Sequence, residues 1–169
     1  MDFSLQKNGT IEFRNIDGFL AAFLMVPFQT KDLGQGVIAK NFYQKLQEKN
    51  SEFSTDWREY IEPELLSLFS SSHQIVLSDL DRMDQEQRLC PNDFFTLKIP
   101  LTHREAWLRM LSMVRLSLTA EHRLDHEKME EETTPSLETA LGRAEIQMQL
   151  FAVVQQCLIE AEEERLNEK

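Results

Sequence analysis

The sequence predicts one α+β domain that is mainly α: a helical bundle with an N-terminal β-hairpin and a candidate third strand near residues 95–99. Three observations predict it. Apolar and polar residues alternate at the N-terminus, apolar residues recur at helical spacing through most of the remainder, and the composition, 41% hydrophobic and 28% charged in 169 residues, is typical of one globular domain. We divide residues 1–169 into a hairpin (1–15), helices with one short strand (16–129), an acidic linker (130–134) and a long last helix (135–166).

The residues around Asn8-Gly9 predict both the hairpin and its register. A two-residue loop at this site would set Leu5 opposite Glu12 and place the two apolar sets on opposite faces of the sheet. A three-residue loop, Lys7 to Gly9 with the glycine left-handed in a bulge, keeps them on one buried face. The expected cross-strand pairs are Leu5 with Ile11 and Phe3 with Phe13. A lone hairpin is marginal in water, so we expect the alternation in 95–99 to supply a third strand.

Helical spacing predicts three segments between the hairpin and the third strand. Residues 17–25 are apolar around the whole axis and stop before Pro27, so this helix should be buried. Residues 38–46 have one apolar and one lysine-rich face, which is typical of an amphipathic helix. A third helix restarts at Pro63, because proline is tolerated in a first turn but costs about 3 kcal/mol in a helix interior. Its expected apolar stripe is Leu68, Phe69, Val76, Leu80 and Met83.

Residues 102–124 form the best-defined predicted helix, which Thr102 and Glu105 open as a capping box. Apolar residues then leave little polar face, so we expect packing on several sides or a subunit interface, for example in a homodimer. The apolar positions singled out are Trp107, Leu111, Val114, Leu116 and Leu118.

The last helix is expected over 135–166, with Pro135 as its first residue. It is long enough to run antiparallel along the 102–124 helix. Its expected apolar stripe is Leu137, Leu141, Met148, Phe151, Val154 and Leu158.

Arg115 lies among the apolar residues of the 102–124 helix. A guanidinium cannot be buried without a partner, so it has to reach a carboxylate, helix-end carbonyls or solvent. We expect an internal clamp to the last helix, with Glu138 or Glu145 as the partner. The alternative is a contact with an anionic ligand.

Histidines and cysteines supply only weak candidate sites. His122 and His126 are four residues apart with carboxylates nearby, but two ligands do not make a metal site, and a solvated surface pair is favoured. Cys90 precedes a proline in a polar connection and is the candidate redox residue, although nothing adjacent in sequence lowers its pKa. Cys157 falls on an apolar helix face and is expected to pack as a small hydrophobe.

No sequence motif supports catalysis or cofactor binding. A nucleophile elbow, a phosphate-binding loop and an HExxH sequence are all missing, so we expect no catalytic residues, no metal and no cofactor. The net charge of −11 makes nucleic acid an unexpected partner, and it disfavours the competing winged-helix architecture. The longest apolar run, residues 19–28, is too short to cross a bilayer. With two cysteines and no secretory leader, we expect a cytoplasmic protein.

The pattern Trp107-x-x-x-Leu111-x-x-x-Arg115-Leu116-x-Leu118 precedes an acidic linker and a long last helix. In this placement it resembles the bacterial family called domain of unknown function 2017, and Pro63-Glu-Leu65 is similar in position. The resemblance covers about residues 60–160. It implies a small cytoplasmic bacterial protein of regulatory or adaptor type, sometimes encoded near a Clp protease adaptor. It implies no catalytic residues.

Two functions from different classes remain open. The preferred hypothesis is a helical interaction, adaptor or regulatory module that binds another protein, because the exposed faces are acidic and the helices carry more apolar surface than one core needs. The alternative is a transcription-associated regulator or a small-ligand or redox sensor, with Cys90 or Arg115 as the responsive group. An enzyme is the third hypothesis.

Overall fold

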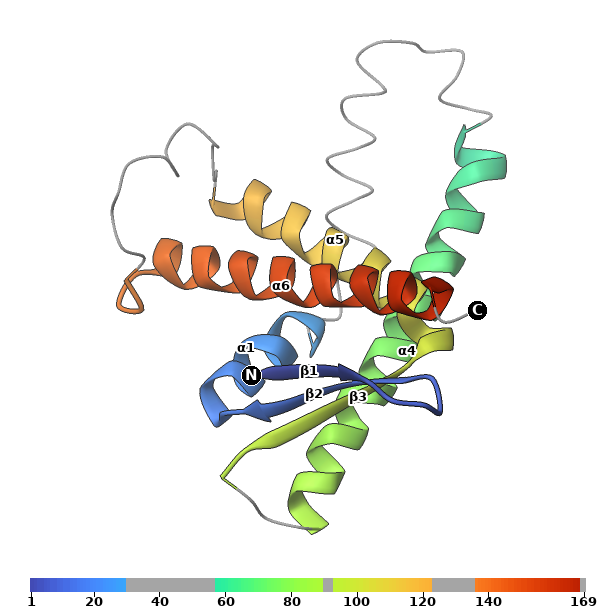
Figure 1. Cartoon of the computed structure of the whole chain (residues 1–169). Helices are drawn as coiled ribbons and strands as arrows, with labels where there is room; N and C mark the ends of the chain where they lie inside the picture. The colour runs from blue at the N-terminus through green and yellow to red at the C-terminus, as the bar shows by residue number, and fades with distance from the viewer. Residues whose placement is uncertain (30–56, 90–92, 123–135, 168–169) are drawn as a thin grey trace.

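The computed structural model describes residues 1–29, 57–89, 93–122 and 136–167, and in them the α+β, mainly α prediction is confirmed. A three-stranded antiparallel sheet in the order β1-β2-β3 lies below the α5–α6 pair, and α4 runs past the strand β3 (Figure 1). The predicted helix at 38–46 and the acidic linker at 130–134 lie outside the described residues. The elements are β1 (Asp2–Leu5), β2 (Thr10–Ile16), α1 (Gly18–Met25), the 3-10 turn η1 (Val26–Gln29), the π turn η2 (Trp57–Ile61), α4 (Glu62–Leu89), β3 (Phe95–Pro100), the 3-10 turn η3 (Leu101–His103), α5 (Arg104–His122) and α6 (Ala140–Asn167).

The hairpin has the predicted register and the predicted three-residue loop. Leu5 pairs with Ile11 and Phe3 with Phe13, and Gly9 has a φ of 76°, which only glycine adopts without strain. The third strand is also confirmed, and its register on β2 places the apolar residues of the two strands opposite each other. These pairs are Ile11 with Ile99 and Phe13 with Leu97.

An irregularity in β2 keeps its last apolar residue in the core. Asn15 adopts a φ of 56°, a left-handed conformation that asparagine tolerates better than most residues. Its Nδ2 donates to Asp2 Oδ2 at 2.5 Å. The register shift between Phe13 and Ile16 lets Ile16 pair with Phe95 and become fully buried.

The helix α1 forms where the sequence predicts it. Asp17 caps it by accepting the Leu20 N–H at 2.8 Å, and the helix ends before Pro27. The following turn η1 is held on α4 by a hydrogen bond of 2.6 Å from His73 Nε2 to the Phe28 carbonyl. The Phe28 ring then packs edge-on against Trp107 and Phe151, with centroids 5.9 and 6.0 Å away.

The helix α4 begins at Glu62 with Pro63 in its first turn, as the cost of an interior proline requires. Its predicted stripe is only partly correct. Val76, Leu80 and Met83 are buried, but Leu68 is exposed because the first turns of α4 rise clear of the sheet (Figure 1).

One prediction about α5 is wrong and another stays open. The helix starts after the 3-10 turn η3, where Thr102 makes no capping hydrogen bond to a described residue and Glu105 pairs with Arg104 instead, at 2.6 Å. Leu116 is 65% exposed, and Ser112, one turn earlier, is exposed too, so within the described residues α5 is not packed on every side and the expected subunit interface stays a prediction. Only the side facing the sheet, α4 and α6 is buried.

The helix α6 begins at Ala140, later than predicted, because residues 136–139 form a turn that caps it. Thr139 Oγ1 accepts the Gly142 N–H at 2.9 Å, and Gly142 packs so closely on the turn that a Cβ would lie 2.1 Å from the Ser136 carbonyl oxygen. Leu137 and Leu141 consequently stay about half exposed, contrary to the predicted stripe. Phe151, Val154 and Leu158 of the predicted stripe are fully buried.

Contacts at both ends show that α5 and α6 run antiparallel, as expected. Arg104 at the start of α5 lies 3.8 Å from Glu162 near the end of α6, while Thr119 near the end of α5 contacts Met148 near the start of α6. In the described part of the chain no helix is long and apolar enough to cross a membrane.

Candidate functional site

The carboxylate of Asp79 on α4 is the most connected polar group of the described core. Its side chain is fully buried, and Oδ2 accepts hydrogen bonds of 2.9 Å from both His103 Nδ1 and Trp107 Nε1. Arg82 Nη1 lies 3.6 Å from Oδ1 and supplies a positive charge from the next turn of α4. Burying an ionised carboxylate is costly unless it is paired in this way. We call these four residues the Asp79 cluster.

The Asp79 cluster ties three elements together. Asp79 and Arg82 come from α4, His103 from η3, and Trp107 from the first turns of α5. The 3-10 turn directs His103 toward α4, while Trp107 inserts its ring into the core with its N–H still paired. The cluster therefore sets the position at which α5 begins to pack on α4.

The chemistry open to the Asp79 cluster depends on His103, whose side chain is 28% exposed. When Nδ1 carries the proton that Asp79 accepts, Nε2 is left as a free acceptor at the edge of the cluster. In other proteins such a carboxylate-oriented imidazole can move a proton or bind a metal. Among the described residues, however, no group of three His, Cys, Asp or Glu side chains is arranged to hold a metal ion.

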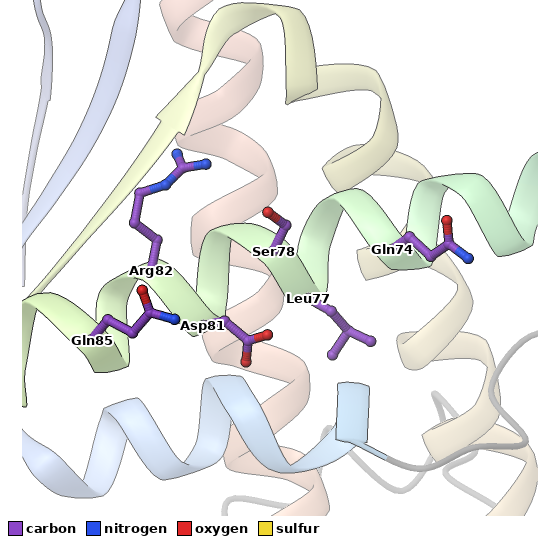
Figure 2. Close-up of a pocket in the computed structure, with 6 residues that line it drawn as sticks. All are labelled: Gln74, Leu77, Ser78, Asp81, Arg82 and Gln85. Atoms are coloured by element: carbon purple, nitrogen blue, oxygen red, sulfur yellow. The ribbon is translucent and has the colours of Figure 1, made fainter.

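A shallow groove of about 380 Å³ runs along α4 next to the Asp79 cluster, and its described wall is mostly polar. Figure 2 shows that these side chains all come from α4, with Leu77 and Asp81 on one side of the helix and Arg82 on the other. Arg82 links the groove to Asp79. The remaining described lining residues are Gln74, Ser78 and Gln85.

The sequence prediction missed Asp79 as a site residue. The signal was present, because Asp79 lies between Val76 and Leu80 on the apolar stripe of α4, where a charged residue has to find a buried partner. It did not identify the partners, since His103 and Trp107 are 24 and 28 residues away in the sequence.

Arg115 is a clamp to the last helix, but its partner is not the predicted one. Nη1 donates to Gln155 Oε1 at 2.5 Å, so neither Glu138 nor Glu145 is used. Gln155 Nε2 in turn donates to Ser112 Oγ at 2.8 Å. The residue as a whole is only partly buried, but its Nε is buried and makes no hydrogen bond to a described residue, so the neutral amide leaves the guanidinium incompletely paired.

The other predicted residues of α5 separate into core and surface. Trp107 and Leu111 are fully buried, Leu118 is half-buried against the core, and Leu116 is exposed. Leu111 and Leu116, five positions apart on one helix, thus face the core and the solvent respectively. The resembling pattern therefore contains both core and surface positions.

The weak metal and redox candidates fall largely outside the described residues. His122 ends α5, whereas His126 and Cys90 are not described. The metal pair and the redox cysteine therefore remain predictions.

Cys157 lies on α6, half-buried beside the core as predicted. Burial raises the pKa of its thiol, and the nearby Glu160 carboxylate raises it further, while a backbone hydrogen bond acts in the opposite direction. In a Cys90→Ser variant we expect iodoacetamide at pH 8 to modify the folded protein several-fold more slowly than the urea-unfolded chain, because the thiolate is the reactive form. Equal rates would contradict this.

The raised pKa of Cys157 also predicts how the stability of the fold depends on pH. Since the thiol pKa is higher in the folded state, the unfolded chain loses its proton first as the pH rises. The contribution of the Cys157 thiol to the free energy of unfolding is therefore fully present below the ordinary thiol pKa. It is lost as the pH rises through the higher pKa of the folded state.

Comparison with known proteins identifies the family. The family model of a domain of unknown function, DUF2017, matches residues 41–162. The chain belongs to the DUF2017 family. The searches of curated proteins and of solved structures found no match.

The DUF2017 match explains part of the architecture. It includes α4, β3, α5 and most of α6, and with them the whole Asp79 cluster. The hairpin and α1 precede the matched range, yet Ile11, Phe13 and Leu24 are fully buried in the same core. In this DUF2017 protein the N-terminal residues therefore complete the fold.

Proposed function

We propose that this DUF2017 protein is a cytoplasmic protein-binding module of adaptor or regulatory type, and that it acts without catalysis. The observation that supports this is an exposed apolar surface on α5 and α6, which we call the outer face. Single exposed apolar residues are common on proteins, whereas grouped ones mark interaction sites. The outer face consists of Leu116, Met148, Ala152 and Ile159.

The contacts between α5 and α6 bring these residues together. Arg115 and Ser112 both bond Gln155, and Thr119 contacts Met148, so this stretch of α5 lies alongside residues 148–155 of α6. Leu116 is 65% and Ile159 42% exposed, while Met148 and Ala152 are half-buried. Ile159 follows Ala152 two turns further along α6. The core side of α6 is occupied by other residues, so the outer face is turned away from the sheet.

The alternative function, a regulator or sensor responding through Arg115 or Cys90, has less support. Nη1 of the Arg115 guanidinium is already engaged by Gln155. The described thiol, Cys157, has a raised pKa, which disfavours thiolate chemistry.

A capture experiment with matched variants tests the proposal. The tagged full-length protein is expressed in its source cells as wild type, as Leu116→Ser/Ile159→Ser, and as Val26→Ser, which alters an exposed apolar residue at the start of the turn η1. We expect one protein to be recovered with wild type and Val26→Ser and to fall at least about fivefold with the double variant. Melting temperatures should stay close to wild type, because the substituted side chains are exposed.

Two results would contradict the proposal. If the double variant retains every protein captured by wild type, or if Val26→Ser loses the same protein, the outer face is not the binding surface.

A further inference from the structure

We infer that the outer face takes a basic amphipathic helix of a partner protein; this rests on the proposed function and names its partner class. The inference combines two features of α6, the spacing of its exposed apolar residues and the carboxylates that flank them.

One row of apolar residues on α6 repeats at the interval used in helix–helix packing. The row contains Ala152 and Ile159 of the outer face and extends it to Leu166, whereas the exposed Val153 lies off the row. Ala152, Ile159 and Leu166 are seven residues apart, which places them in one row along the helix. Ile159 is 42% and Leu166 58% exposed. A row of this spacing matches a second helix lying nearly parallel or antiparallel to α6, with its own apolar residues every three or four positions.

Two carboxylates lie beside the second half of the row, and neither forms an ion pair with a described residue. Glu163 is four residues after Ile159 and three before Leu166, which places it on the same side of the helix, and it is exposed. Glu160 follows Ile159 directly and accepts only the Gln156 side-chain amide, at 2.9 Å. The cations in reach are already engaged, because Arg104 pairs with Glu105 and both Arg104 and Arg165 contact Glu162. Lysine or arginine side chains beside the apolar residues of a partner helix would complement these carboxylates.

Charge also argues against a second copy of this chain as the occupant. Each copy carries a net charge of −11, and a two-fold contact through this surface would place the same surplus of carboxylates on both sides. A basic helix has the opposite sign and meets no such repulsion.

The test uses two synthetic peptides of about 18 residues that share a leucine row at helical spacing. One carries lysines beside the row and the other glutamates. Binding to the full-length protein is measured by fluorescence anisotropy at low and high salt. We expect the lysine peptide to bind at least about tenfold more tightly than the glutamate peptide and to weaken as salt screens the charges.

Matched variants locate the binding surface. Ile159→Ser and Glu160→Gln/Glu163→Gln should each weaken the lysine peptide about fivefold or more, since one removes apolar contact and the other removes charge. Glu121→Gln, an exposed carboxylate at the end of α5, should leave the affinity unchanged. Circular dichroism of each variant confirms the fold.

Three results would overturn the inference: equal affinity for the two peptides, affinity that Ile159→Ser does not change, or a dimer in sedimentation velocity that Ile159→Ser dissociates. If the peptides fail while Leu116→Ser/Ile159→Ser still loses its captured protein, the proposed function stands and only the partner class is wrong. If the captured protein survives that double substitution, the proposed function itself fails.

Discussion

Replacing Trp107 with alanine is expected to lower the free energy of unfolding by about 3–5 kcal/mol, the range for removing a large aromatic side chain from a core. Trp107 is fully buried, packs on the Phe28 ring, and donates its indole N–H to Asp79. The substitution therefore leaves a cavity and removes a hydrogen bond together. Urea unfolding followed by circular dichroism measures the loss.

Leu116→Ala is the matched control, because it lies on the same helix but is 65% exposed. Its effect should stay within about 0.5 kcal/mol. Similar losses for Trp107→Ala and Leu116→Ala would contradict the division of α5 into a core side and a surface side.

Asp79→Ala is expected to cost about 3 kcal/mol, because it deprives the Trp107 N–H and the His103 imidazole of their common acceptor. The buried indole N–H is then left without a hydrogen bond. Asp79→Asn should cost less, since an amide oxygen still accepts one hydrogen bond although the charge near Arg82 is lost.

A double-mutant cycle separates the hydrogen bonds of Asp79 from its packing. Asp79→Ala and Trp107→Phe should be non-additive, because both remove the same Asp79–Trp107 bond. Additive effects would show that this bond contributes nothing to stability. Asp81→Ala, the exposed carboxylate two residues further along α4, is the control and should have little effect.

The Asp79 cluster and the outer face are connected through α5. The cluster sets where α5 starts on α4, and the Arg115–Gln155–Ser112 hydrogen bonds then set α6 against α5. The exposed residues Leu116 of α5 and Ile159 of α6 take their relative positions from these contacts. The proposed outer face thus depends on polar contacts inside the fold.

The elements that could be predicted are those with local causes. The hairpin register follows from alternation and from a left-handed glycine. The third strand at 95–99, the cap at Asp17 and the restart at Pro63 depend likewise on residues close in the sequence.

The errors concern features that depend on distant neighbours. Leu68 belongs to an apolar stripe but lies where α4 rises clear of the sheet. The partner of Arg115 was expected to be a carboxylate, yet Gln155, 40 residues away, lies opposite it. The last helix was expected to begin at Pro135, yet α6 begins at Ala140, where Thr139 Oγ1 accepts the Gly142 N–H.

The sequence by itself determined the α+β class, the strand register and the family, because these depend on periodicity, turn chemistry and a pattern of residues along the chain. Only the tertiary structure decided that Asp79 joins His103 and Trp107, and that Leu116 and Ile159 stay exposed. The physical reason is that burial and hydrogen bonding act through space. The packing of distant elements decides which side chains become a residue's partners, and the spacing of residues along the chain does not encode that packing.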